Sequence, residues 1–325
     1  MRTLRKIVLS DADSVRKLHR ETPNPFDVDT LFQLIDSRVP GGDVAFGAFD
    51  ANECLGIQLL YQYKLRFGGA DFNALHSTCT LTKASERSQG LGIELIRESI
   101  KLCQLEKVDC FSFCIDSRLT GKWENECIES FTPYSKVHKF AAQFTPFFRP
   151  ATPGNSGGIS ARPIDFEKGE YEQYLNHRAE FFFDNDVIDA PTERTKLLSS
   201  RFPSSHLILK LAKANHPVGF IKVLILRIAR KTGIQAQAIL TEICAARADW
   251  KEAIEAVDAA LKGIGISAYL INNGLLFELD TLQTCGFFPS PTAINLHLFY
   301  RGHREDIVKA MGDWSGATRF FVPIK

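Results

Sequence analysis

The chain has 325 residues, of which 45% are hydrophobic and 24% are charged, and its formal net charge is +1. This length allows two ordinary domains, and the composition is typical of a soluble globular protein. The balanced charge argues against nucleic acid as a partner, because binding to a phosphate backbone requires clustered Lys and Arg.

Local composition gives no sign of secretion, membrane insertion or metal binding. Residues 1–15 lack the apolar core and small-residue cleavage site of a signal peptide. No apolar stretch approaches the ~18 residues that span a bilayer. The eight cysteines include no Cys-x-x-Cys pair, and His and Cys do not cluster at metal-ligand spacing. We therefore expect a cytoplasmic protein with no metal and no membrane association.

The first half of the chain alternates strand and helix patterns. A short strand is expected over 5–9, and a helix that Ser10 or Asp11 can cap follows it. The remaining expected elements are a helix over 29–37, strands over 44–49, 55–65 and 72–81, an amphipathic helix from Leu91, and a buried strand over 109–116.

The second half repeats this order after a Pro-, Gly- and Ser-rich segment near 150–158. The expected elements are a helix over 170–182, strands over 206–212, 218–228 and 235–244, a helix over 249–262 and a strand over 266–271. Both halves also contain Ala-Asn-x-x-apolar-Gly before a long apolar strand, at 51–56 and 214–219. We predict a tandem repeat of one α/β unit, with domains over 1–150 and 159–325 and a linker over 151–158.

The two halves differ where the third long strand meets the next helix. The interval from Gly56 to Asp116 is six residues longer than the interval from Gly219 to Asn273. The first half reads TLTKASERSQGLGIEL at this junction, and the second half reads EICAARADWKEAI. A loop that one copy lacks is unnecessary for the fold, which makes it a candidate for function.

Two nucleotide-binding motifs are excluded for this loop. The dinucleotide fingerprint needs a third glycine where Leu95 stands, and the P-loop needs Gly-Lys-Ser/Thr where Gly92-Ile93-Glu94 stand. Two interpretations stay open: a cradle of backbone N–H groups for an anion at a helix N-terminus, or a turn that only starts a helix.

The Arg-x-x-Gly-x-Gly pattern from Arg87 to Gly92, between an apolar strand and an amphipathic helix, resembles the GNAT (GCN5-related N-acetyltransferase) superfamily. The resemblance covers roughly residues 4–150, with a degenerate second copy over 164–300. It implies an α/β (α+β mixed-sheet) fold of two GNAT-like domains, each a twisted, mostly antiparallel sheet flanked by helices.

The resemblance also implies acetyl-CoA, or another acyl-CoA, as co-substrate. Backbone N–H groups of the loop would surround the CoA pyrophosphate. In this family the strand before the loop splays from its neighbour, and its main chain pairs with the pantetheine arm. The implied cofactor-binding residues are Leu81, Thr82, Arg87, Ser88, Gln89, Gly90, Leu91, Gly92 and Asn125.

The implied chemistry is direct attack of an amine on the thioester, assisted by a general base and a general acid. The acid is often a tyrosine on the helix after the last central strand, but Phe131 stands at that place and Tyr134 follows a proline. Tyr134 is therefore either the acid or a packing residue. His76 is the candidate base, with a hydrogen-bonded structural histidine as the alternative. His138 and Glu242 are weaker candidates.

Two functions follow from the resemblance. The first is an N-acyltransferase that moves an acetyl or other acyl group to an amine of a small polar acceptor, such as an amino sugar, amino acid or peptide. The second is a non-catalytic module that binds or senses acyl-CoA. Either could act as a monomer or a homodimer.

Overall fold

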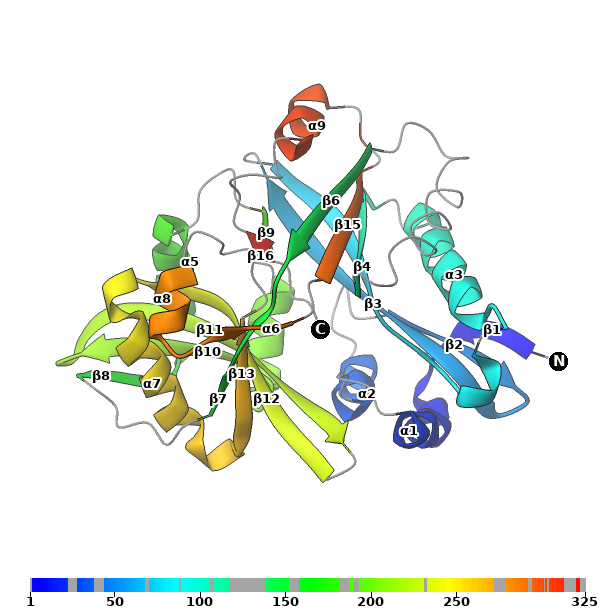
Figure 1. The fold of residues 1–325 in the computed structure, drawn as a ribbon, viewed down its shortest axis with the longest axis horizontal. Helices are drawn as coiled ribbons and strands as arrows, with labels where there is room; N and C mark the ends of the chain where they lie inside the picture. Colours follow the sequence, from blue (N-terminus) through cyan, green and yellow to red (C-terminus); the bar gives the residue numbers. More distant parts are fainter. Residues whose placement is uncertain are drawn as a thin grey trace.

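A computed structural model of the chain describes residues 2–22, 28–37, 44–67, 70–87, 89–105, 108–116, 138–151, 158–181, 187–189, 193–230, 233–271, 279–291, 294–300, 302, 304–312 and 320–321. These residues form two β-sheets with helices on their faces (Figure 1). The predicted mixed α/β class is confirmed.

The first sheet begins with five strands in the order in which the chain makes them. They are β1 (Arg2–Lys6), β2 (Val44–Asp50), β3 (Glu53–Phe67), β4 (Ala70–Thr82) and β5 (Cys110–Asp116). The first four are antiparallel neighbours, and β5 runs parallel to β4. The helices α1 (Ala12–Glu21) and α2 (Val28–Ser37) share an apolar core with one face, and α3 (Leu91–Leu105) packs on the other.

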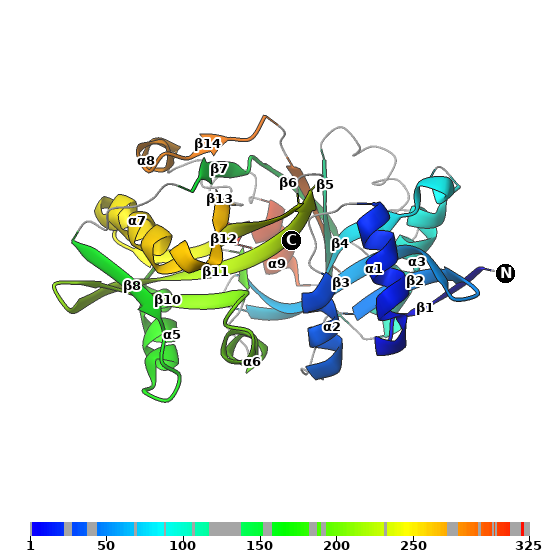
Figure 2. The same ribbon diagram turned by 90° about the horizontal axis from the view of Figure 1, so that it is seen from below.

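The second sheet begins in the same way. Its strands β8 (Ile159–Pro163), β10 (His206–Lys213), β11 (His216–Arg230), β12 (Gly233–Ala245) and β13 (Ile266–Ile271) repeat that order and those directions. The helices α5 (Glu170–Phe181) and α6 (Glu193–Arg201) lie on one side of this sheet, and α7 (Trp250–Leu261) lies on the other (Figure 2).

The halves exchange one strand each. In the first sheet, β15 (Ile294–Tyr300) lies between β5 and β6 (His138–Phe144). In the second sheet, β7 (Phe147–Pro150) lies between β13 and β14 (Phe288–Pro289). The strands β7 and β15 thus each lie at the equivalent place in the sheet of the other half. The domain boundaries 1–150 and 159–325 stay a prediction. Each exchanged strand belongs by sequence to one predicted domain and lies in the sheet of the other.

Further short elements complete the two halves. The strand β9 (Val187–Asp189) pairs with the last residues of β3, at Leu65 and Arg66. The strand β16 (Phe320–Phe321) pairs with β9. The helices α8 (Leu279–Thr284) and α9 (Glu305–Gly312) precede β14 and follow β15. None of the helices in the described ranges is long and apolar enough to cross a membrane.

A buried ion pair fastens the exchanged strand β7 to the second half. The Nη1 atom of Arg149 lies 2.7 Å from the Oδ2 atom of Asp258 on α7, and both side chains are buried. The guanidinium also lies over the ring of Tyr269 on β13. Because removing one partner of a buried pair leaves an uncompensated charge, this contact makes the exchange costly to undo.

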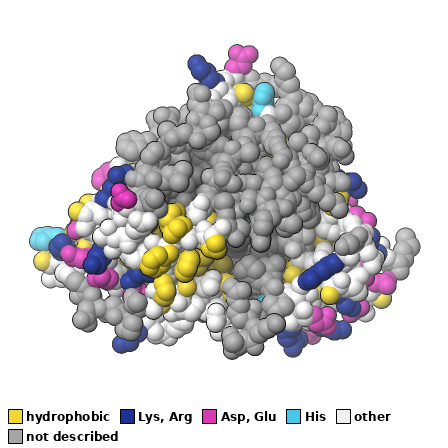
Figure 3. Space-filling model, viewed as in Figure 1, with side chains coloured by type: hydrophobic (Ala, Val, Ile, Leu, Met, Phe, Trp, Pro, Cys, Tyr) yellow, Lys and Arg dark blue, Asp and Glu magenta, His cyan; other side chains and the backbone are white. Residues whose placement is uncertain are grey.

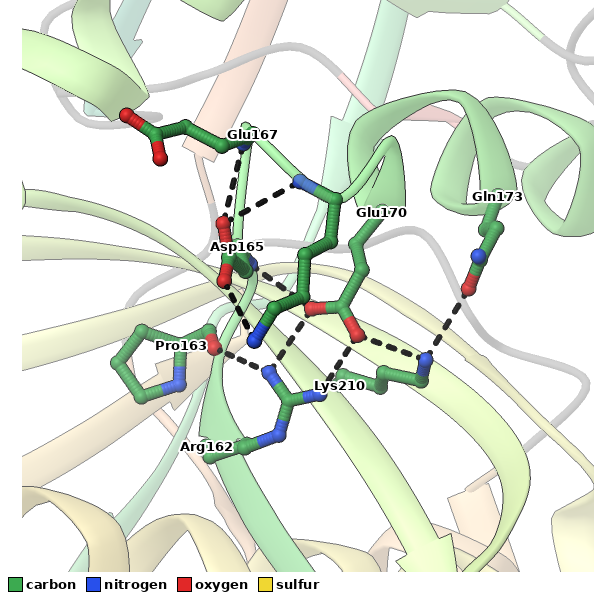
Figure 4. Close-up of polar contacts among 8 residues, drawn as sticks. Arg162, Pro163, Asp165, Glu167, Glu170, Gln173 and Lys210 are labelled. Carbon is green, nitrogen blue, oxygen red and sulfur yellow. Dashed lines mark hydrogen bonds and ion pairs between the residues drawn. The ribbon is translucent and has the colours of Figure 1, made fainter.

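In each half, an arginine–carboxylate pair joins the first strand to the segment that follows it. Arg5 donates to both carboxylate oxygens of Asp11, at 2.6 and 2.7 Å, and to the carbonyl of Lys6. Arg162 donates to both oxygens of Glu170, at 2.8 and 2.6 Å, and to the carbonyl of Pro163 (Figure 4). This correspondence supports the predicted repeat.

Hydrophobic side chains gather on the surface of the second half (Figure 3). The large apolar side chains that are exposed include Phe148 of β7 and Phe288 of β14, whose ring centroids lie 6.4 Å apart. They belong to neighbouring strands at one edge of the second sheet.

Candidate functional site

The paired strands allow the two halves to be aligned residue by residue. Gly56 of β3 lies opposite Thr82 of β4, and Gly219 of β11 lies opposite Ala245 of β12. After Thr82 and Ala245 both halves continue into a short 3-10 turn, over Ala84–Glu86 and Arg247–Asp249.

The halves diverge directly after this turn. In the second half α7 begins at once with Trp250, whereas in the first half residues 87–90 precede Leu91, the first residue of α3. Leu91 and Trp250 are both buried, so each helix starts against its sheet in the same way. The structure therefore places four of the six extra residues at this junction, as an insertion of residues 87–90 that is called the insert below. Ser88 lies outside the described residues.

Gly90 sets the conformation of the insert. Its φ is +82°, which glycine adopts readily and other residues rarely do. A Cβ atom at this position would meet nothing within 4 Å, so the backbone dihedral, and not crowding, requires the glycine. The carbonyl of Gly90 accepts the N–H of Glu94 at 3.0 Å, and the side-chain amide of Gln89 donates to the carbonyl of Ser85 at 2.8 Å.

The start of α3 is electrostatically suited to an anion. The first N–H groups of a helix, here at Leu91, Gly92 and Ile93, have no acceptor within the helix, and the helix dipole places positive potential there. Arg2 neutralises the nearby acidic side chains: its Nη2 atom lies 2.9 Å from both carboxylate oxygens of Glu94, and its Nη1 atom lies 3.7 Å from Glu86.

The strands β4 and β5 separate beside this helix start. Their parallel pairing runs from Ala74 opposite Cys110 to Ser77 opposite Phe113, while β4 continues to Thr82 and β5 to Asp116. We call the diverging ends, residues 78–82 and 114–116, the fork, and the last pair its vertex. Among the described strands none pairs with residues 78–82 on the β5 side. Their main-chain groups can therefore pair with an extended ligand, as the resemblance implied.

The two β4 residues that the sequence placed beside the pantetheine arm differ in side-chain exposure. The Leu81 side chain is buried in the core under α1 and α2, so only its main chain is available to a ligand. Thr82, at the open end of the fork, is half-buried. Arg87 and Gln89 of the insert are exposed, and Gly92 is half-buried at the first turn of α3.

A buried polar cluster lies at the vertex, and sequence reasoning did not identify it. The Nε2 atom of Gln58 donates to the Ser77 hydroxyl at 2.8 Å and to the carbonyl of Leu59 at 3.1 Å, and the Thr80 hydroxyl donates to Gln58 Oε1. Gln58 is completely buried and Ser77 is 4% exposed. The signal in the sequence was a Gln within the apolar stretch 54–61 of β3, but its partners depend on a β4 bulge at Cys79.

The candidate base His76 lies in the paired part of β4, next to the vertex. It sits opposite Ser112 of β5 and is 1% exposed. Burial lowers the pKa of His76 to about 4, so the imidazole is neutral at pH 7. A group with so low a pKa is a weak acceptor for the proton of an amine near neutrality. Its catalytic role stays a prediction.

Of the other candidates, Glu242 is committed to a buried network in the second half. Arg178 Nε and the Tyr174 hydroxyl each lie 2.7 Å from its Oε2 atom. Burial alone would raise the pKa of Glu242, but the charges of Arg178 and Lys222 hold that pKa well below its usual value. Glu242 is therefore a structural ion-pair partner.

The remaining predicted positions are His138, Tyr134 and Asn125. His138 begins β6, and its ring centroid lies 6.4 Å from that of Tyr300. Tyr134 and Asn125 lie outside the described residues. Within the described ranges no group of three or more His, Cys, Asp or Glu side chains could hold a metal ion.

Comparisons with known proteins identify the fold. No protein-family model matches the chain, and no curated protein matches it. Among solved structures, Saccharomyces cerevisiae N-myristoyltransferase with bound myristoyl-CoA is similar with a TM-score of 0.66 and 11% identity, over 93% of this chain and 79% of that one. A putative acetyltransferase from Pyrococcus horikoshii gives 0.53 and 13%, over 92% and 90%.

A third similar structure is named for the family that the Arg87–Gly92 pattern resembles. The GCN5-related N-acetyltransferase from Kribbella flavida has a TM-score of 0.51 and 10% identity, over 92% of this chain and 70% of that chain. At these identities the similarity establishes a shared fold. The two-unit GNAT-like fold implied by the Arg87–Gly92 pattern is thereby confirmed.

Proposed function

We propose that the chain is an acyl-CoA-dependent N-acyltransferase, whose first half binds the CoA ester in the fork. One observation carries this proposal: the insert occurs in only one of two equivalent units, and it lies at a helix N-terminus beside the open end of the fork. The fold shared with N-acyltransferases supports it.

The insert and α3 supply the phosphate site. The pyrophosphate accepts the N–H groups of the first turn of α3, and the helix dipole adds favourable potential. Gly90 turns the chain into the helix, and the exposed Arg87 side chain can reach the phosphates. The pantetheine arm then runs along the main chain of residues 78–82, which places the thioester near the vertex.

In the proposed reaction a neutral amine attacks the thioester carbonyl carbon. The N–C bond forms, the C–S bond breaks with its electron pair on sulfur, and CoA leaves as the thiolate. The proton lost by the amine passes to a base or to water. His76 and Tyr134 are the candidates for base and acid.

The donor and acceptor are proposed by class. Acetyl is the proposed acyl group, and the fold shared with N-myristoyltransferase makes a long-chain acyl-CoA the second donor to test. The proposed acceptor is the amine of an amino sugar, amino acid or peptide. A cytoplasmic location is part of the same proposal.

The test is thiol release from acetyl-CoA and myristoyl-CoA in the presence of a panel of amines. Amine-dependent release, with the acylated amine identified by mass spectrometry, supports an enzyme. CoA binding without turnover across the panel favours the alternative, an acyl-CoA sensor, to which the buried His76 with its low pKa also points. Absence of any CoA binding contradicts both.

A further inference from the structure

The vertex of the fork is polar in the first half and apolar in the second. Counting from the pairs Gly56–Thr82 and Gly219–Ala245, each member of the polar cluster has an equivalent. The equivalents of Gln58, Ser77 and Thr80 are Ile221, Leu240 and Ile243, and all three of these belong to the apolar core of the second half.

The fold therefore does not need polar residues at the vertex. Burying the Gln58 amide and the Ser77 hydroxyl costs free energy unless hydrogen bonds compensate, and aliphatic side chains fill the same positions in the second half without that cost. The unit that has the insert is also the unit that has the polar cluster. These two differences between the copies thus fall on one site.

Of the side-chain N–H and O–H groups in the cluster, these hydrogen bonds use all but one. Gln58 must turn its Nε2 atom toward the Leu59 carbonyl, which can only accept, and this fixes the orientation of the amide. Its second N–H then donates to the Ser77 hydroxyl. Ser77 accepts that bond, so its own hydrogen is available, and no acceptor for it lies among the residues that the structure describes.

This donor is buried at the point where β4 leaves β5. Ser77 is 4% exposed and forms the last β4–β5 pair with Phe113. A donor held in a water-poor site stabilises negative charge more strongly than the same group does in water. A thioester lying in the fork would bring its carbonyl oxygen, where negative charge develops during acyl transfer, to this end.

We propose that the Ser77 hydroxyl donates a hydrogen bond to the carbonyl oxygen of the thioester bound in the fork, and that Gln58 is the positioning residue that orients it. This inference rests on the proposed function. As the amine forms the N–C bond, the carbonyl π electrons move to oxygen, and Ser77 stabilises that oxyanion while keeping its own proton. The electrons then return, the C–S bond breaks, and CoA departs as the thiolate.

The kinetic test compares Ser77→Ala with a control elsewhere. Ser205→Ala removes another buried serine hydroxyl, in the second half. Loss of one oxyanion donor lowers kcat by about 10²–10³-fold. We expect that loss for Ser77→Ala with KM for acyl-CoA nearly unchanged, a smaller loss in kcat for Gln58→Met, and no change for Ser205→Ala.

A second measurement needs no turnover. The infrared carbonyl stretch of acetyl-CoA labelled with ¹³C at the thioester carbonyl is recorded on the bound complex. A hydrogen bond from Ser77 lowers this frequency, so Ser77→Ala should raise it and Ser205→Ala should not. Thermal denaturation checks that each variant is folded. An unchanged frequency in a folded, CoA-binding Ser77→Ala contradicts this inference alone, whereas failure of the wild-type chain to bind CoA contradicts the proposed function.

Discussion

The guanidinium of Arg149 and the carboxylate of Asp258 form a buried ion pair, 2.7 Å apart, between residues of different halves of the chain. Arg149 stands on the strand that the first half inserts into the second sheet. The pair therefore joins the exchanged strand to the helix that follows β12. The two halves stabilise each other through this contact.

Arg149→Met should destabilise the whole molecule. It leaves Asp258 buried without its cation, which typically costs about 3–5 kcal/mol. Urea denaturation should show that loss in the free energy of unfolding. The double variant Arg149→Met/Asp258→Leu should recover most of it, because it removes the uncompensated charge. Equal stability of Arg149→Met and the wild-type chain would contradict the role given to the pair.

The Arg162–Glu170 pair predicts acid sensitivity. The hydrogen bonds from Arg162 hold the pKa of Glu170 well below its usual value. A carboxyl whose pKa is lower in the folded state stabilises the fold above its unfolded pKa, and this stability is lost as the pH falls below about 4.5. Because Arg162 is largely exposed, we expect a contribution on the order of 1 kcal/mol.

Denaturation of wild type and Glu170→Gln at pH 7 and pH 3 measures this contribution. The difference in unfolding free energy between the two chains should be larger at pH 7 than at pH 3. A difference that does not change with pH assigns the stabilisation to something other than the charge.

His76 predicts a second pH dependence, at higher pH. Its pKa falls from 6.5 to about 4 because burial disfavours the charged form. The unfolded chain therefore takes up a proton more readily, and stability should decline as the pH falls from about 6.5 toward 4. His76→Gln should remove this part of the decline. A kcat/KM profile with a His76-dependent step near pH 6.5 would show instead that the ring titrates as if it were exposed.

The junction in the second half predicts how many CoA molecules bind. Trp250 begins α7 directly after the 3-10 turn, and its indole N–H donates to the carbonyl of Ala245 at 3.0 Å. This side chain is therefore held at the last residue of β12, which is the equivalent of Thr82 at the open end of the fork. Isothermal titration calorimetry should therefore give one CoA per chain. A stoichiometry of two would mean that the insert is not required.

The sequence predicts the elements whose patterns are local. The alternation and helical period place β2, β3, β4 and α3 within a few residues of their observed bounds. The strands β7 and β15 were not predicted. Their exchange between the halves has no local signal, because a short apolar strand carries no information about which sheet it joins. The helix α6 and the strand β9 were also missed.

The candidate site divides in the same way. The Arg87–Gly92 pattern is contiguous, and the comparison of the two copies located the insert near its observed place. The cluster of Gln58, Ser77 and Thr80 joins residues of two strands, and it depends on a bulge that sets the register. Only with that register can the aliphatic equivalents in the second half be identified.

The most direct test of the central claim compares two glycines that share a backbone conformation. Gly90 and Gly265 have φ values of +82° and +72°, and a Cβ at either would meet nothing within 4 Å. Leucine at either position therefore introduces a similar backbone strain. By isothermal titration calorimetry with CoA, Gly90→Leu should abolish binding and Gly265→Leu should bind like the wild-type chain. Wild-type affinity in a folded Gly90→Leu variant would contradict the assignment of the insert as the pyrophosphate site.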